Sequence, residues 1–188
     1  MSTPATTADL FARLDALGIC YSNTPHRSVF TVEEGADLKA AMPGGHSKNL
    51  FLKDKKGKLF LLCALSDSVI DLNALSKLIG AGRFSFGNAE LLMQHLGVTP
   101  GSVTLFALIN DSERSVTLLL DQAFFSYDLV NFHPLRNDAT TAITPADMVR
   151  FVESLGRTPI RIAFDADGKP SLPDPLIEPG DASAHLSG

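Results

Sequence analysis

The chain has 188 residues, 45% of them hydrophobic and 20% charged, which is typical of a soluble globular protein with one domain of ordinary size. Its net charge of −5 is not that of a basic nucleic-acid-binding domain. No apolar run approaches the roughly 20 residues that span a bilayer, so we expect no membrane partner.

The N-terminal segment and the cysteines predict a cytoplasmic protein. Residues 1–7 lack a basic stretch followed by an apolar one, so they do not form a secretory signal. Cys20 and Cys63 lie far apart without CxxC spacing, which indicates neither a zinc site nor a disulfide framework. Two free thiols fit a reducing compartment best.

The first half of the chain predicts helices, short strands and a hairpin. Leu10 and Leu14 recur at helical spacing behind a cap at Thr6, and Gly18 would end that helix. Two short apolar runs around a polar loop that contains Gly57 are a hairpin signature. The expected elements are a helix ending near residue 17, a strand over 20–23, a helix over 32–42, hairpin strands over 50–52 and 59–62, a helix over 71–79, a strand over 84–86 and a helix over 88–96.

The second half predicts further strands and one more helix. Thr144 followed by Pro145 is a helix start, and that helix should run to residue 155. Strands are expected over 103–109, 115–120, 127–132, 140–143 and 159–164. Proline, glycine, aspartate and serine then dominate the sequence, so we divide the chain into a domain over 1–167 and an extended or disordered tail over 168–188.

The order of these elements favours the α+β fold class. Strands and helices are interspersed without regular alternation, and no internal repeat is visible. We expect a single domain with a mixed, largely antiparallel β-sheet and flanking helices.

The usual enzyme signatures are missing from the sequence. GxSxG, HExxH, Walker and GxGxxG motifs do not occur, and the five histidines are scattered, so we expect no metal site and no cofactor. Both cysteines are interpreted as small buried hydrophobic residues rather than nucleophiles.

One segment carries polar residues where a buried strand begins. Lys48 and Asn49 precede an apolar run in which Leu50 and Leu52 would face one way and Phe51 the other, so that both faces are buried. A lysine there has two interpretations. It marks the end of a strand, or it is a positioned cation beside an amide, suited to hold a phosphate, a ribose or a developing oxyanion.

The same segment resembles the signature of a known family. Residues 48–54 (Lys-Asn-Leu-Phe-Leu-Lys-Asp), followed by Lys-Lys-Gly and an apolar strand, look like the YbaK-like prolyl-tRNA editing family. Residues 97–103 (Gly-Val-Thr-Pro-Gly-Ser-Val) resemble its substrate loop, and residues 132–137 (Phe-His-Pro-Leu-Arg-Asn) its late histidine segment. The resemblance covers roughly residues 5–165 and includes the free-standing relatives of an editing domain inserted in some bacterial prolyl-tRNA synthetases.

The resemblance implies a hydrolase that needs no metal. Lys48 takes the place of the residue most important for deacylation, and water activated by the substrate would attack the ester. A lysine of ordinary pKa near 10 is protonated at neutral pH, so its role would be electrostatic rather than that of a base. The substrate-binding residues implied are Asn49, Gly97, Val98, Thr99, Pro100, Gly101, Ser102 and His133.

Each of these segments also has a purely structural interpretation. The 97–103 segment is equally a tight loop leading into a strand, and His133 is equally a satisfied polar residue near a strand end. Lys53, Lys55 and Lys56 belong to a run in which five lysines face one acid, Asp54. They are expected to contact the tRNA acceptor stem, and the alternative is a solvated turn.

The predicted function is trans-editing. The protein would hydrolyse mischarged Ala-tRNA(Pro) to alanine and tRNA. The expected partners are that tRNA and prolyl-tRNA synthetase, and no DNA is expected. The Lys-Asn-Leu-Phe-Leu sequence resembles the alanine-clearing branch more than the cysteine-clearing one. Two alternatives stay open: a deacylase for cysteine or serine on tRNA, and a non-catalytic module that binds tRNA or a synthetase.

Overall fold

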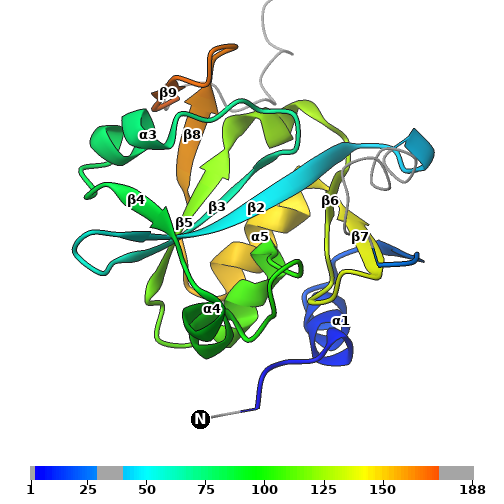
Figure 1. Cartoon of the computed structure of the whole chain (residues 1–188). Helices are drawn as coiled ribbons and strands as arrows, with labels where there is room; N and C mark the ends of the chain where they lie inside the picture. The colour runs from blue at the N-terminus through cyan, green and yellow to red at the C-terminus, as the bar shows by residue number, and fades with distance from the viewer. Residues whose placement is uncertain (1–2, 29–39, 174–188) are drawn as a thin grey trace, which may run out of the picture.

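A mixed β-sheet forms the centre of the protein. The computed structural model describes residues 3–28 and 40–173, and in them the strands follow the order β1-β7-β6-β2-β3-β5-β8-β9, with β4 beside β2. The long strand β2 (Gly45–Asp54) crosses the sheet and forms the hairpin with β3 (Leu59–Leu65) (Figure 1). The remaining strands are β1 (Ser22–Pro25), β4 (Phe84–Phe86), β5 (Val116–Asp121), β6 (Val130–Phe132), β7 (Ala139–Ile143), β8 (Ile160–Phe164) and β9 (Pro170–Ser171).

The predicted fold class is confirmed. Five of the strand pairings in the described residues are antiparallel, and three are parallel, namely β2 with β6, β3 with β5, and β5 with β8. The sheet is therefore mixed and largely antiparallel, in one domain with flanking helices. None of the described helices is long and apolar enough to cross a membrane.

The helices begin and end where their capping residues predict. Thr6 caps α1 with a full capping box, and Asn88 caps α4, which ends at Gly97 in the left-handed conformation. Thr144 accepts a hydrogen bond from Asp147 N–H at the start of α5. The helices are α1 (Thr7–Ala16), α3 (Leu72–Leu78), α4 (Ala89–Leu96) and α5 (Pro145–Ser154), with 3₁₀ helices η1 (Leu105–Asn110) and η2 (Gln122–Ser126).

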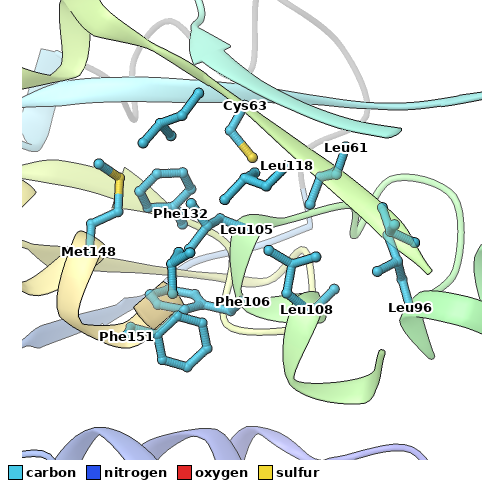
Figure 2. Close-up of a cluster of buried hydrophobic side chains, with 14 of the residues drawn as sticks. Leu61, Cys63, Leu96, Leu105, Phe106, Leu108, Leu118, Phe132, Met148 and Phe151 are labelled. Atoms are coloured by element: carbon cyan, nitrogen blue, oxygen red, sulfur yellow. The ribbon is translucent and has the colours of Figure 1, made fainter. Parts of the chain in front are cut away.

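Two hydrophobic clusters occupy the two faces of the sheet. Leu61, Cys63 and Leu118 point from the sheet toward η1 and α5, where they meet Phe106 and Phe151 (Figure 2). The smaller cluster packs α3 against the other face, and its members are Leu52, Phe60, Leu62, Leu75, Leu119 and Ile162. The prediction that both faces of β2 are buried is confirmed, because Phe51 belongs to the larger cluster and Leu52 to the smaller one.

Several predicted elements differ from the structure. The strand expected over 103–109 is wrong, since Thr104 accepts a hydrogen bond from Phe106 N–H and starts η1. An unbroken apolar run fits a buried helix as well as a strand, and pattern alone does not separate them. The strand expected over 127–132 shortens to β6, and the first strand lies two residues later than expected, at β1.

Two predicted regions extend past the described residues. The helix expected over 32–42 lies mostly outside them, although Ala40 and Ala41 are helical. The boundary expected at 167/168 falls within the turn of the β8–β9 hairpin, where Gly168 N–H donates to Asp165 O. The division into a domain and a tail stays a prediction.

Candidate active site

Lys48 and Asn49 emerge from opposite faces of β2. Side chains alternate along a strand, so Lys48 shares a face with Leu52 of the smaller cluster, and Asn49 shares the other with Phe51. Within β3, Ala64 lies opposite Lys48 and Cys63 lies opposite Asn49. The two neighbouring residues therefore do not form one side-chain pair.

The ammonium group of Lys48 is held by main-chain oxygens. Nζ donates a hydrogen bond to Ser66 O at 3.3 Å and a second to Ser68 O. Both oxygens belong to the turn that follows β3, and Ser66 N–H donates back to His46 O on β2 at 2.7 Å. The charge of Lys48 is thus fixed beside the hairpin rather than extended on a solvated stem.

Asn49 is half-buried, and its amide oxygen is unusual. Its Nδ2 donates to Ser47 Oγ at 3.1 Å, whereas its Oδ1 is buried and has no hydrogen-bond partner among the described residues. A buried acceptor without a partner costs about 1–3 kcal/mol. The role predicted for Asn49 in substrate binding stays a prediction.

One edge of β2 has no strand partner beside Lys48 in the described part of the chain. Gly45 and His46 pair with β6, and Leu52 to Asp54 pair with β4. Residues 47–50, between these two stretches, pair only with β3 in the described part of the chain. Main-chain groups at such an edge bind an extended ligand readily.

Strand alternation places His133, the residue after β6, on the same face of the sheet as Lys48. His46 and Asn131 are partners in the parallel β2–β6 pair, and Lys48 and His133 each follow two residues later. The His133 ring lies half-buried, with Nδ1 at 3.1 Å from Ala139 O and its centroid 6.4 Å from that of His26. Burial lowers the pKa of His133 and outweighs the hydrogen bond to Ala139, with a smaller lowering by His26. The neutral imidazole is therefore favoured at neutral pH.

His26 and Thr140 complete this polar group, and sequence reasoning missed both. His26 Nε2 lies 2.9 Å from Thr140 Oγ1, and its Nδ1 lies 2.7 Å from Arg27 O. They lie 114 residues apart in sequence, and only the pairing of β1 with β7 brings them together. Within residues 3–28 and 40–173, no group of three or more His, Cys, Asp or Glu side chains could hold a metal ion.

The predicted substrate loop lies beside the histidine segment. A Cβ built on Gly101 would lie 3.7 Å from Asn137 Nδ2, in the segment that follows His133. Ser102 N–H donates to Thr99 O at 3.0 Å and closes the turn around Pro100. The described contacts join this loop to the segment that follows His133, and its role in substrate binding stays a prediction.

The two glycines of this loop should respond differently to substitution. Both have positive φ, but a Cβ on Gly97 (φ +63°) would lie 2.7 Å from Asn110 Nδ2 and 2.8 Å from Pro4 Cβ, whereas at Gly101 (φ +89°) nothing lies nearer than 3.7 Å. Gly101→Ala should cost about 1–2 kcal/mol from backbone strain alone, and Gly97→Ala clearly more. Urea titration measures both. If the loop binds substrate, Gly101→Ala also raises KM, and damage to stability alone would favour the structural interpretation.

The lysine-rich hairpin presents its positive charges outward. Lys55 and Lys56 are exposed, and Lys53 is half-buried. The single acid, Asp54, is turned inward and accepts hydrogen bonds from the N–H groups of Lys56, Lys58 and Gly82. Desolvation would raise the pKa of Asp54, but these three bonds outweigh it and lower the pKa. The hairpin surface is consequently cationic.

Comparison with known proteins identifies the class that this fold and site define. The model of the aminoacyl-tRNA editing domain family matches residues 26–151, and the chain belongs to this family. The resemblance noted from residues 48–54 is thereby confirmed.

Within this family, the chain is similar to proteins whose names refer to prolyl-tRNA. A zebrafish (Danio rerio) protein named prolyl-tRNA synthetase associated domain-containing protein 1 is 42% identical over 142 residues, covering 74% of this chain and 77% of that one. The prolyl-tRNA editing protein ProX of Acetoanaerobium sticklandii is 33% identical over 150 residues, covering 79% and 92%. A crystal structure of a protein suggested to be a trans-editing enzyme for prolyl-tRNA synthetase has a TM-score of 0.62 at 19% identity, covering 86% and 96%, and shares the fold.

Proposed function

We propose that this protein is a cytoplasmic trans-editing deacylase that hydrolyses the ester of mischarged Ala-tRNA(Pro). Membership of the editing-domain family supports the reaction class, and the relative named ProX supports prolyl-tRNA as the nucleic acid. The observation that carries the proposal is the placement of Lys48 on β2, where two carbonyls of the turn after β3 hold its ammonium on the face of the sheet that strand alternation assigns to His133.

The chemistry required of such a site is modest. Water attacks the ester carbonyl carbon, the bond to the ribose oxygen breaks, and that oxygen takes up a proton, giving alanine and tRNA. An ammonium group that already donates to two carbonyls is suited to stabilise negative charge on the attacked ester or to bind a nearby phosphate, and not to remove a proton from water. Holding the ester in place supplies much of the remaining rate.

The need for a second site follows from size. A synthetase pocket built for proline excludes the smaller alanine weakly, since each missing methylene costs only about 1–3 kcal/mol of discrimination. An editing site corrects the error if it admits alanine and excludes the proline ring. His133, half-buried with a lowered pKa, and the loop at Gly101 are the groups that we propose shape this pocket.

A panel of charged tRNAs tests the proposal and its alternatives. Purified protein is incubated with alanyl-, cysteinyl-, seryl- and prolyl-tRNA(Pro), and loss of the ester is followed. We expect loss from the alanyl form. Preferential loss from the cysteinyl or seryl form would favour a deacylase for those residues, and no loss from any form would favour a non-catalytic module that binds tRNA or prolyl-tRNA synthetase.

Charge reversal on the hairpin tests the proposed tRNA contact. Lys55→Glu and Lys56→Glu should each weaken tRNA binding. Each should also make the negative slope of the log binding constant against log salt concentration shallower by about 1, because each phosphate contact releases about one counterion. Fluorescence anisotropy at several salt concentrations measures this slope. Lys169→Glu, on the exposed β8–β9 turn, is the matched control. Equal slopes for all three variants would favour the alternative interpretation, in which the hairpin is a solvated turn that does not contact tRNA.

A further inference from the structure

Asp121 is a buried carboxylate with an unusual set of hydrogen bonds. It is the last residue of β5, and only 1% of its surface is exposed. Its Oδ2 accepts from Leu65 N–H at 3.1 Å and from Ser68 Oγ–H at 2.7 Å, and its Oδ1 accepts from Ala123 N–H at 2.9 Å. A buried charge is costly unless it is hydrogen-bonded in this way. The carboxylate therefore favours the one main-chain geometry in which these N–H groups point toward it.

The groups bound by Asp121 belong to the turn that holds Lys48. Leu65 ends β3, and Ser68 N–H donates to Leu65 O at 3.1 Å, which closes a turn over residues 65–68. Asp121 binds this turn at its first and last residues, through Leu65 N–H and the Ser68 hydroxyl. The carbonyls of Ser66 and Ser68 in the same turn accept the hydrogen bonds of the Lys48 ammonium.

We infer that Asp121 is a positioning residue for Lys48, acting through the Ser68 hydroxyl and the 65–68 turn. Its carboxylate fixes the turn, and the turn's carbonyls fix the ammonium beside the end of β3. The hydrogen bonds that link Asp121, the 65–68 turn and Lys48 are observed in the structure and do not depend on the function of the protein. Their consequence for catalysis rests on the function proposed above.

A carboxylate is required at this position because both oxygens accept hydrogen bonds. An asparagine has one acceptor and one donor, so an N–H group would face either Ala123 N–H or Leu65 N–H. Ser68→Ala is a milder change, because it removes one hydroxyl and leaves the bonds from Leu65 and Ala123 to Asp121 in place. Ser68→Ala therefore tests the positioning of Lys48 without disrupting the folding of the sheet.

A matched control for Ser68→Ala exists elsewhere in the chain. Ser115 Oγ–H donates at 2.8 Å to Asp111, another buried carboxylate, which pairs with Arg157 rather than with the turn at Lys48. Ser115→Ala therefore removes the same serine–carboxylate bond from a different place, together with a contact of 2.8 Å to His95 Nδ1. Any general loss of stability on deleting a serine–carboxylate bond should appear in both variants.

Amine labelling tests the inference without reference to catalysis. Wild type and the Ser68→Ala, Asp121→Asn and Ser115→Ala variants are treated with acetic anhydride, and the labelling rate of each lysine is measured by mass spectrometry. Lys48 should be labelled about fivefold faster in Ser68→Ala, the ratio that corresponds to one net hydrogen bond. Its rate should not change in Ser115→Ala. A Lys48 rate within twofold of wild type in Ser68→Ala would overturn the inference, whether or not Asp121→Asn folds.

Deacylation of Ala-tRNA(Pro) by the same variants separates this inference from the proposed function. Ser68→Ala should lower kcat about tenfold and leave KM within twofold, since a displaced Lys48 weakens the transition state rather than substrate binding. An equal loss in Ser115→Ala would contradict a specific positioning role. If Lys48 labelling rises as expected but wild type cleaves no substrate, the hold on Lys48 stands and the proposed function fails.

Discussion

Lys48→Ala should lower the rate of deacylation by about 10²–10³-fold, the usual effect of removing one group that stabilises an oxyanion. The variant should still fold, because the hydrogen bonds from Lys48 to Ser66 O and Ser68 O contribute only about 0.5–1.5 kcal/mol each. Single-turnover hydrolysis of Ala-tRNA(Pro) measures the rate, and urea titration measures the stability.

The control for Lys48 is Lys77→Ala, on the exposed side of α3. It removes the same side chain from a different surface and should leave the rate unchanged. Near-normal turnover in Lys48→Ala would remove Lys48 from the mechanism. A loss of rate that parallels a loss of folded protein would show that Lys48 supports the hairpin instead.

Arg157→Ala should destabilise the protein by about 3–5 kcal/mol, because it leaves the buried carboxylate of Asp111 without its cation. The side chains of Arg157 and Asp111 are 6% and 2% exposed, and Nη2 lies 2.6 Å from Oδ2. Arg157 also donates to Val116 O and Asp111 O, so it joins the end of η1 and the start of β5 to the residues after α5. Urea titration at pH 7 measures the loss.

An exposed ion pair provides the control for this substitution. Arg136 pairs with Asp138 between β6 and β7, where the Arg136 side chain is 58% exposed, and Arg136→Ala should cost less than about 1 kcal/mol. A similar small loss in Arg157→Ala would mean that water reaches Asp111 and that the pair is not buried in solution.

The same ion pair makes stability depend on pH. Burial would raise the pKa of Asp111, but hydrogen bonds from Val116, Ser115 and Arg157 outweigh it and hold the pKa below the usual 3.8. A carboxyl group whose pKa is lower in the folded state contributes stability above its unfolded pKa, and this is lost as pH falls through the folded value. Without Arg157 the folded pKa rises, so the acid-induced loss should begin at a higher pH.

Local signals in the sequence were sufficient for most helices and for the hairpin. Thr6 and Thr144 each cap the helix that they were expected to cap, because capping depends on residues within one turn. The two apolar runs around Gly57 pair as expected, in a register from Ser47–Leu65 to Lys53–Leu59. These features need only a few neighbouring residues.

Features that depend on distant pairing were missed. The parallel alignment of β3 with β5 places Asp121 at the end of β3, and no local pattern indicates that contact. The same holds for His26 and Thr140, which meet through β1 and β7. The apolar run that forms η1 was misassigned because it is buried on all sides.

The site was predicted as a list of residues rather than as an arrangement. Lys48 was singled out from a resemblance, whereas composition and spacing alone left it as a lysine at the end of a strand. The structure adds the turn at Ser66 and Ser68 that holds its ammonium, the open edge of β2 beside it, and the shared face with His133. It also separates Lys48 from Asn49, which lies on the other face.

The central claim is that this protein removes alanine, and not proline, from tRNA(Pro). The most direct measurement is the fraction of ester remaining after the wild-type protein is mixed in excess with labelled Ala-tRNA(Pro) or Pro-tRNA(Pro). We predict that the alanyl ester is lost well ahead of its spontaneous hydrolysis while the prolyl ester persists at the uncatalysed rate. Persistence of both esters, or equal loss of both, would contradict the claim.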